Sequence, residues 1–149
     1  MTDSYKEGCR EGVIFALVKD KELLIEKRPS KDGVEFFIPN GGIEEKDKKK
    51  DEDYRITALK REAKEELNID ILDFEYLMDH KVDEIKIWFY IYLIKKWKGE
   101  IPNFTVEPPG SNIKFADLEW IKIKDYKKIF SLPSALKTCE KIIERLNLL

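Results

Sequence analysis

The sequence predicts one mixed α/β domain spanning residues 1–149, in which strands outnumber helices. Three observations support that prediction. The length of 149 residues falls within the usual size range of one domain. The continuous apolar run Gly12–Val18 is typical of a buried strand. Between residues 53 and 67 the apolar side chains recur at helical spacing instead, so the chain combines strands with at least one amphipathic helix.

The first third of the chain is expected to hold three strands. After a turn at residues 19–21, the apolar segment Glu22–Glu26 predicts the second strand. Turn-forming residues at 30–33 indicate a loop. The short strand Phe36–Ile38 follows, and Pro, Asn and two Gly at 39–42 end it.

A central helix is expected at about residues 53–67, after a charged segment. Residues 44–53, with the sequence EEKDKKKDED, predict a solvated loop that leads into it. Asp53 is a candidate N-cap, and Asn68 stands where a left-handed residue commonly ends a helix. Spacings of three, four and four residues give the helix one apolar stripe, formed by Ile56, Leu59, Ala63 and Leu67.

The second half of the chain is expected to add strands and a second helix. Segments 69–76, 85–94 and 118–123 are rich in β-branched and aromatic residues and predict strands, with loops at 98–103 and 107–112. Pro133 precedes a C-terminal helix whose apolar side chains recur at helical spacing, namely Leu136, Cys139, Ile143 and Leu146.

Composition excludes several classes of protein. With 28 basic and 30 acidic residues the net charge is −2, which argues against a stable nucleic-acid partner. The longest apolar run, Ile87–Ile94, is far shorter than the ~20 residues that span a bilayer. The first twelve residues lack an export signal pattern, and two distant cysteines do not suggest a disulfide framework. We therefore expect a cytoplasmic protein that is not bound to a membrane.

The central helix carries the strongest chemical signal. Glu62, Glu65 and Glu66 are spaced by three and four residues, so they share one helix face, which is expected to lie opposite the apolar stripe. Carboxylates that converge in this way repel one another unless a cation lies between them, and Mg²⁺ or Mn²⁺ prefers such oxygen ligands. The alternative is an ordinary solvated acidic face, which is common on surface helices.

The context of this helix resembles the Nudix box, the signature of the Nudix hydrolase family. The segment Arg61-Glu-Ala-Lys-Glu-Glu-Leu-Asn-Ile69 matches the second half of the box at every position except the glycine, which is Asn68 here. The resemblance extends from Gly12 to about Leu132 and implies an α/β/α sandwich, in which a mixed sheet lies between the box helix and a C-terminal helix. Box positions are assigned to Gly41, Gly42, Glu44, Asp53, Arg61, Glu62, Glu65, Glu66 and Asn68.

One part of the box departs from the family pattern. The family has a glutamate eight residues before the arginine, and Asp53 occupies that position here. The family also has six positions from the glycine to that acid, whereas Gly41 and Asp53 are twelve apart. About six residues are therefore expected to be inserted before Asp53, within the lysine-rich segment 45–52.

The resemblance implies a role for each site residue. Glu62, Glu65, Glu66 and the Gly41 carbonyl would bind Mg²⁺ or Mn²⁺, with Glu44 as an additional or supporting ligand. Glu107 would bind metal or take a proton from the attacking water, although an exposed loop acid is the alternative interpretation. Arg61 would orient a carboxylate, so that Glu62, Glu65, Glu107 and Arg61 form the catalytic group. Arg28 would contact a substrate phosphate, or else form a surface salt bridge.

The implied reaction is hydrolysis of a nucleoside triphosphate, such as a dNTP or 8-oxo-dGTP, to a monophosphate and pyrophosphate. The alternatives are an RNA 5′ end or a dinucleoside polyphosphate as substrate, or a non-catalytic binding module. Leu136 falls where mutator-type relatives have Asn, which weakens the 8-oxo-dGTP assignment. Trp88, Tyr90, Phe104 and Phe115 are candidate base-stacking residues, and His80 has no evident partner. A monomer or a homodimer is expected.

Overall fold

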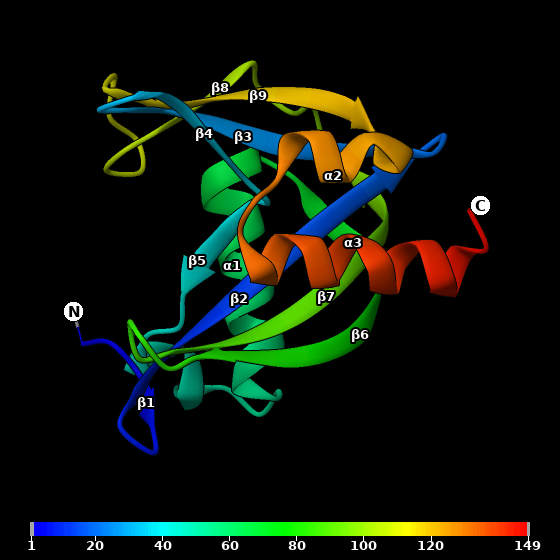
Figure 1. Cartoon of the computed structure of the whole chain (residues 1–149). Coiled ribbons are helices and arrows are strands. Elements are labelled where there is room, and N and C mark those ends of the chain that lie inside the picture. The colour runs from blue at the N-terminus through cyan, green and yellow to red at the C-terminus, as the bar shows by residue number, and fades with distance from the viewer. Residues whose placement is uncertain (1, 149) are drawn as a thin grey trace.

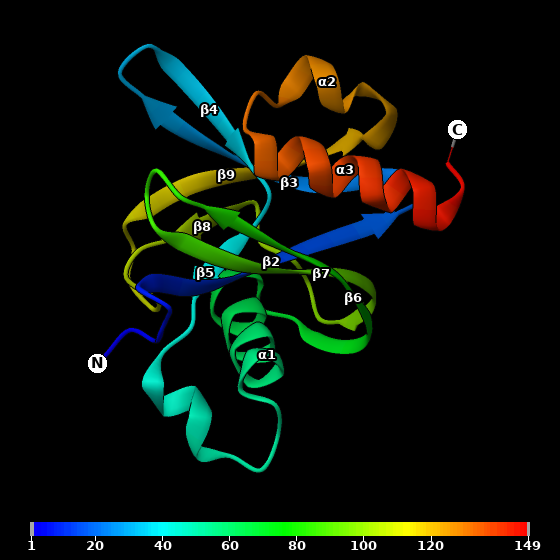
Figure 2. The ribbon, with the colours of Figure 1, turned by 60° about the horizontal axis from the view of Figure 1, so that its bottom comes forward.

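The computed structural model describes residues 2–148 and shows a mixed β-sheet with helices on both faces. The strands are β1 (Tyr5–Lys6), β2 (Cys9–Lys19), β3 (Glu22–Ser30), β4 (Gly33–Phe37), β5 (Asn40–Gly42), β6 (Asp70–Val82), β7 (Ile87–Lys98), β8 (Phe104–Val106) and β9 (Lys114–Lys122). The helices are η1 (Glu45–Lys49), α1 (Tyr54–Leu67), η2 (Ile123–Asp125), α2 (Tyr126–Ile129) and α3 (Pro133–Leu146). The predicted fold class is confirmed: α1 and α3 lie on opposite faces of the sheet (Figures 1 and 2).

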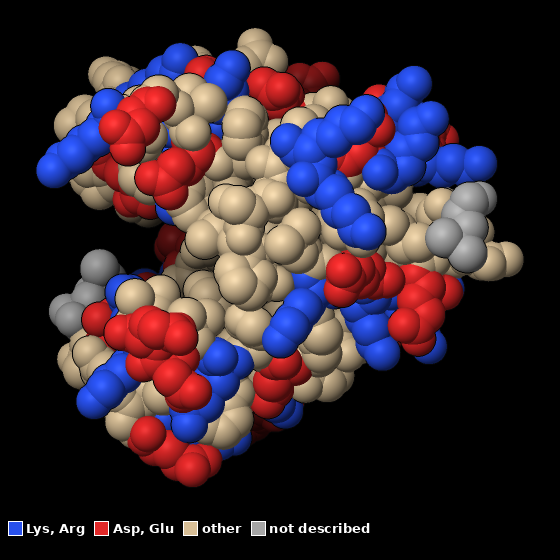
Figure 3. Space-filling model, in the orientation of Figure 1, with Lys and Arg blue, Asp and Glu red and all other residues tan. Residues whose placement is uncertain are grey.

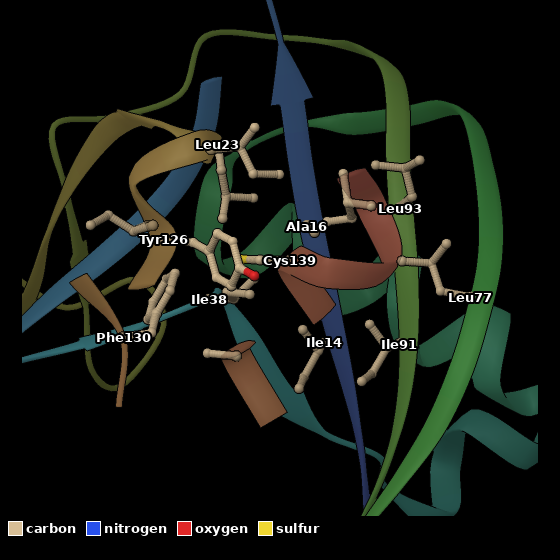
Figure 4. Packing of buried hydrophobic residues seen from close by; sticks show 14 residues of the cluster. Ile14, Ala16, Leu23, Ile38, Leu77, Ile91, Leu93, Tyr126, Phe130 and Cys139 are labelled. Carbon is tan, nitrogen blue, oxygen red and sulfur yellow. The ribbon is translucent and has the colours of Figure 1, made fainter. Parts of the chain in front are cut away.

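Two buried clusters, one on each face of the sheet, hold these layers together. Alternate side chains of β2 point to opposite faces, so Val13 and Phe15 pack with α1 while Ile14 and Ala16 pack toward α3. Figure 4 shows the second cluster, in which Cys139 of α3 lies among side chains of the central strands. Both helices bury one face, but the buried positions of α3 are Ala135, Thr138, Cys139 and Ile142. Of the other residues in the predicted stripe, Leu136 and Ile143 are partly buried and Leu146 is exposed.

The central strands β2 and β3 diverge, and this divergence creates room for a site. The sheet order is β6-β7-β2-β3-β9-β8, and β2 runs parallel to β7. However, β2 pairs with β3 only at Val18–Leu23 and Lys19–Glu22, next to their connecting turn. Beyond that point β2 pairs with β5 instead, and β3 pairs with β4 and β9. Figure 3 shows a deep notch between the two parts, with acidic atoms recessed in it.

Several elements differ from the sequence-based expectation. The predicted loop at 30–33 is the tight turn of a β3–β4 hairpin, in which Gly33 has a positive φ of 125°. The strands β1, β5 and β8 were not predicted, because two or three residues are too few to show a hydrophobic period. No helix among residues 2–148 is long and apolar enough to cross a membrane.

Candidate functional site

An acidic cavity of about 540 Å³ lies between the two diverging parts of the sheet. Its walls come from the acidic face of α1, from β5 and the residues after it, from β3, and from the loop after β8. It brings together ten residues that the sequence analysis singled out, namely Arg28, Gly41, Gly42, Glu44, Arg61, Glu62, Glu65, Glu66, Glu107 and Phe115. Asp53 and Asn68, the other two assigned box positions, do not line it.

Arg61 connects most of the acidic groups on one side of this cavity. Its guanidinium donates to the Gly42 carbonyl at 3.0 Å, to Glu62 Oε1 at 3.0 Å and to Glu65 Oε2 at 3.2 Å. It also forms an ion pair with Glu44 at 3.1 Å. One planar cation with five donors thereby fixes the helix carboxylates relative to β5.

The acid that anchors Arg61 is Asp47, which the sequence analysis did not single out. Arg61 Nε donates to Asp47 Oδ1 at 2.9 Å and Nη2 donates to Oδ2 at 2.8 Å, which makes a two-bonded fork. The Glu44 backbone N–H also donates to Asp47, whose side chain is only 2% exposed. Burial by itself would raise the pKa of Asp47, but these hydrogen bonds lower it overall.

The assignment of Asp53 as the acid of the box is therefore corrected. Asp53 is exposed, caps α1 by accepting from the Arg55 N–H at 2.9 Å, and pairs with the Arg55 side chain. The N-cap prediction is confirmed, but within residues 2–148 no hydrogen bond or ion pair joins Asp53 to Arg61. Asp47 lies six positions after Gly41, which is the family spacing. The inserted residues thus follow Asp47 instead of preceding the acid of the box. Counting six positions forward from Gly41 would have identified Asp47.

Glu62 lies deeper than its position on a helix face suggested. It is buried, not directed away from the apolar stripe, because α1 packs directly against β5 at this point. A Cβ atom added to Gly41 would lie 2.1 Å from Glu62 Cδ, so only glycine leaves room for the carboxylate. Asn68 has φ 57° and ends α1 in the left-handed conformation, as predicted.

The carboxyl groups of the cavity raise one another's pKa values. Burial raises the pKa of Glu62 to about 7, although Arg61 opposes the shift. Burial, followed by the nearby charges of Glu26 and Glu107, raises the pKa of Glu66 to about 8. Such crowded oxygen ligands are a donor set that suits Mg²⁺ or Mn²⁺. As they stand, no three acidic, histidine or cysteine side chains in residues 2–148 are arranged around a metal position.

Arg28 borders this cavity and is held rigidly. Its guanidinium lies 4.0 Å from the ring centre of Phe37 and 4.7 Å from that of Phe115, so both of its faces are covered. Its Nη2 donates to Glu26 Oε1 at 3.0 Å. Phe115, a candidate base-stacking residue, is thus occupied by an arginine. Arg28 thus forms a salt bridge, as the alternative interpretation expected, but with a buried partner and in the wall of the cavity.

A second cavity, of about 690 Å³, adjoins the first and shares Arg28 and Asn40 with it. Its walls include the apolar side chains of Ile14, Phe37 and Phe89, the turn between β6 and β7, and the start of α3. His80 lines it too, a position that the sequence analysis did not predict.

Most of the aromatic candidates lie outside the second cavity. Trp88, Tyr90 and Phe104 do not line it. Tyr90 is buried and donates a hydrogen bond to Glu11, and Trp88 donates to Asp79. Leu136 packs against the core near the start of α3, while Leu132 to Ala135 form the cavity wall. Tyr90 is therefore a core residue, whereas base stacking by Trp88 and Phe104 stays a prediction.

Comparison with known proteins identifies the family. The NUDIX domain model matches residues 10–141, so the chain belongs to the Nudix family and is classed with its hydrolases, as the sequence analysis inferred. No curated protein sequence matches the chain.

Solved structures show the same fold at low sequence identity. A MutT Nudix hydrolase from Burkholderia pseudomallei is 23% identical over 91% of this chain and 99% of its own, with a TM-score of 0.65. A structure from work on MutT of Aliivibrio salmonicida and Vibrio cholerae is 21% identical over 91% and 98%, with a TM-score of 0.66. The NUDIX domain of Shewanella oneidensis NrtR, in complex with ADP ribose, is 15% identical over 95% and 90%, with a TM-score of 0.64.

Proposed function

We propose that the protein hydrolyses a nucleoside triphosphate to the monophosphate and pyrophosphate, with Mg²⁺ or Mn²⁺ bound in the acidic cavity. The observation that carries the proposal is the shared wall of the two cavities at Arg28 and Asn40. A charged cavity that adjoins a mainly apolar one suits a molecule with a polyphosphate at one end and a base at the other. A dNTP or an oxidised dNTP fits this description, and a role in clearing damaged nucleotides would follow.

In this proposal the carboxylates hold the cation and Arg61 holds the carboxylates. Glu62, Glu65, Glu66, Glu107 and the Gly41 carbonyl are the proposed ligands. The bound cation neutralises phosphate charge and lowers the pKa of water. Arg61 keeps Glu62 and Glu65 fixed relative to β5, which is a positioning role because its donors already contact protein groups.

The remaining residues bind the substrate and accept the proton. Arg28 presents its guanidinium edge to a phosphate, because its faces are covered by Phe37 and Phe115. The oxygen of water bonds to phosphorus, the oxygen that bridges the α- and β-phosphates leaves with the pyrophosphate, and a carboxylate accepts the proton from water. Glu107 and Glu66, which both line the acidic cavity, are the candidates for that acceptor.

The lysine-rich segment does not favour an RNA substrate. Lys46 forms an ion pair with Glu44 and Lys48 forms one with Glu45, so acidic neighbours compensate its positive charge. A continuous basic groove would be needed to follow an RNA backbone. We therefore retain the small-molecule nucleotide as the proposed substrate, acted on in the cytoplasm by a monomer or homodimer.

The test is release of pyrophosphate from a panel of nucleotides in the presence of Mg²⁺. The panel contains the four dNTPs, 8-oxo-dGTP, ADP-ribose and a dinucleoside polyphosphate. Glu65→Gln should lower the rate by roughly 10²-fold or more, whereas Glu119→Gln, an exposed change on β9, should not. No turnover of any nucleotide by the folded protein would favour a binding module, and full activity of Glu65→Gln would rule out the proposed ligand set.

A further inference from the structure

Glu26 is a buried acid whose second carboxylate oxygen has no partner. The side chain is 2% exposed and lies on β3, two residues before Arg28. Its Oε1 accepts from Arg28, while Oε2 has no hydrogen-bond donor. Within residues 2–148 only two other buried side-chain atoms lack a partner, namely Arg28 Nε and Thr105 Oγ1. Buried charged groups are expected to be fully paired, so an open oxygen and an open donor on one ion pair require an explanation.

The surroundings of Glu26 are acidic. Among the neighbouring charges, the Glu26 carboxylate raises the pKa of Glu66 most strongly. The charge of Glu107 raises the pKa of both Glu26 and Glu66. Since Arg28 holds Oε1, the unpaired Oε2 is the oxygen left to interact with these two carboxyl groups. Three acidic groups therefore lie near one another, and two of them, Glu66 and Glu107, line the cavity.

Arg28 alone cannot balance this charge. It is one cation against three carboxyl groups, and Phe37 and Phe115 hold it in place. The opposite side of the cavity differs, because there Arg61 contacts every acidic group that faces it. Carboxyl groups outnumber the arginine on both sides, but the Arg28 side is where a buried carboxylate oxygen is left without a partner among residues 2–148.

We propose that Glu26 is a further ligand for a divalent cation, which it binds through Oε2 together with Glu66 and Glu107. This inference rests on the proposed function and extends it, because Glu26 lies on β3, outside the box helix and its loops. A divalent cation with hard oxygen preference matches the donors. It would partner the open oxygen and separate the three acids.

The arrangement also accounts for the open donor on Arg28. Glu26 Oε2 and Arg28 Nε belong to the same ion pair, so a cation bound by Glu26 would lie close to Arg28. A phosphate oxygen that ligates this cation can therefore accept a hydrogen bond from Arg28 Nε. Mg²⁺ in proteins is commonly bound by one or two carboxylates and by substrate phosphates. Glu26 would thus join the cation to the phosphate-binding arginine.

The experiment counts bound Mn²⁺ by the electron paramagnetic resonance signal of the free ion, without any nucleotide. Wild type, Glu26→Gln, Glu65→Gln and the exposed control Glu119→Gln are titrated in parallel. Glutamine keeps the size of Glu26, can accept from Arg28 and can donate to a neighbouring carboxylate, so the variant should fold. We expect Glu26→Gln to lose a Mn²⁺ site, or to bind it roughly 10- to 100-fold more weakly, while the control binds as wild type does.

A second variant guards against misfolding and separates charge from position. Glu26→Asp keeps the charge but withdraws the oxygen, and it should weaken the same site while thermal unfolding shows an intact fold. If Glu26→Gln and Glu26→Asp bind Mn²⁺ as wild type does, Glu26 serves only Arg28 and the inference is overturned. If only Glu65→Gln loses Mn²⁺, while both Glu26 variants bind it as wild type does, the proposed function is supported although the inference about Glu26 is overturned. Absence of Mn²⁺ binding in the wild type would overturn both.

Discussion

Replacing Asp47 with Asn removes the charge that anchors Arg61 and leaves the size of the side chain unchanged. A hydrogen bond to a charged group contributes about 1.5–3 kcal/mol to stability. Arg61 keeps its contacts with Gly42, Glu62 and Glu65, so we expect the whole change to cost about 2 kcal/mol. For a chain of this size that corresponds to a fall in melting temperature of about 4–8 °C.

Asp53→Asn is the matched control, because it makes the same chemical change at the other candidate acid. Asn caps helices about as well as Asp, and an exposed ion pair such as that with Arg55 contributes about 0–1 kcal/mol. Asp47→Asn should also lower the hydrolysis rate by roughly 10- to 100-fold, because Arg61 without its charged anchor holds the Glu62 and Glu65 carboxylates in place less firmly. Asp53→Asn should leave the rate unchanged.

The pH dependence of this difference gives an independent check. Burial opposes but does not cancel the hydrogen bonds from Arg61 and Glu44 that hold the pKa of Asp47 below its ordinary value. A lowered pKa adds stability that is present above the ordinary aspartate pKa and is lost as the pH falls through the native value. The gap in unfolding free energy between wild type and Asp47→Asn should therefore be constant near neutrality and close in acid. Equal losses in the Asp47 and Asp53 variants, or a gap that widens in acid, would refute the reasoning.

Further predictions concern the glycine of the cavity, its carboxyl groups and the end of α1. Gly41→Ala should displace the Glu62 carboxylate and lower activity by roughly 10²-fold with folding retained, as circular dichroism would check. In the native state the pKa of Glu62 is raised to about 7 and that of Glu66 to about 8. Without metal, the free energy of unfolding should therefore fall as the pH rises from the ordinary glutamate pKa to about 8. Thermal unfolding should show that Mg²⁺ reverses this fall. Asn68→Gly should change stability by less than about 1 kcal/mol, whereas Asn68→Val should cost about 1–2 kcal/mol in urea unfolding.

Periodicity located the elements that bury a long apolar face. The helix α1 was predicted to within one residue of its start, because a stripe at helical spacing, an N-cap acid and a left-handed Asn agree with one another. The same rules could not find β5, since its three residues form a strand only through pairing with β2. The cavity depends on that pairing, which brings Gly41 against Glu62.

Site residues on α1 were accessible from the sequence because helical spacing is a local property. The partners of these residues were not, because they depend on contacts between distant segments. Asp47 lies in a run of ten charged residues in which any acid could have paired with Arg61. Glu26 lay within an apolar strand, where one acid between Ile25 and Lys27 has the appearance of a normal strand residue. Only its burial and its open oxygen distinguish it.

The two arginines divide the acidic cavity into a part whose arginine is fully paired and a part that keeps unpaired polar groups. Arg61 is bound by Glu44, Asp47, Glu62 and Glu65, so the geometry of that part is set before any ligand arrives. Arg28 is bound by Glu26 alone, and its part keeps an unpaired carboxylate oxygen and an unpaired N–H. Because unpaired buried groups are costly, the second part gains most from a cation and a phosphate. The Arg28 part also borders the second cavity, so phosphate bound there would be the phosphate nearest to the nucleoside.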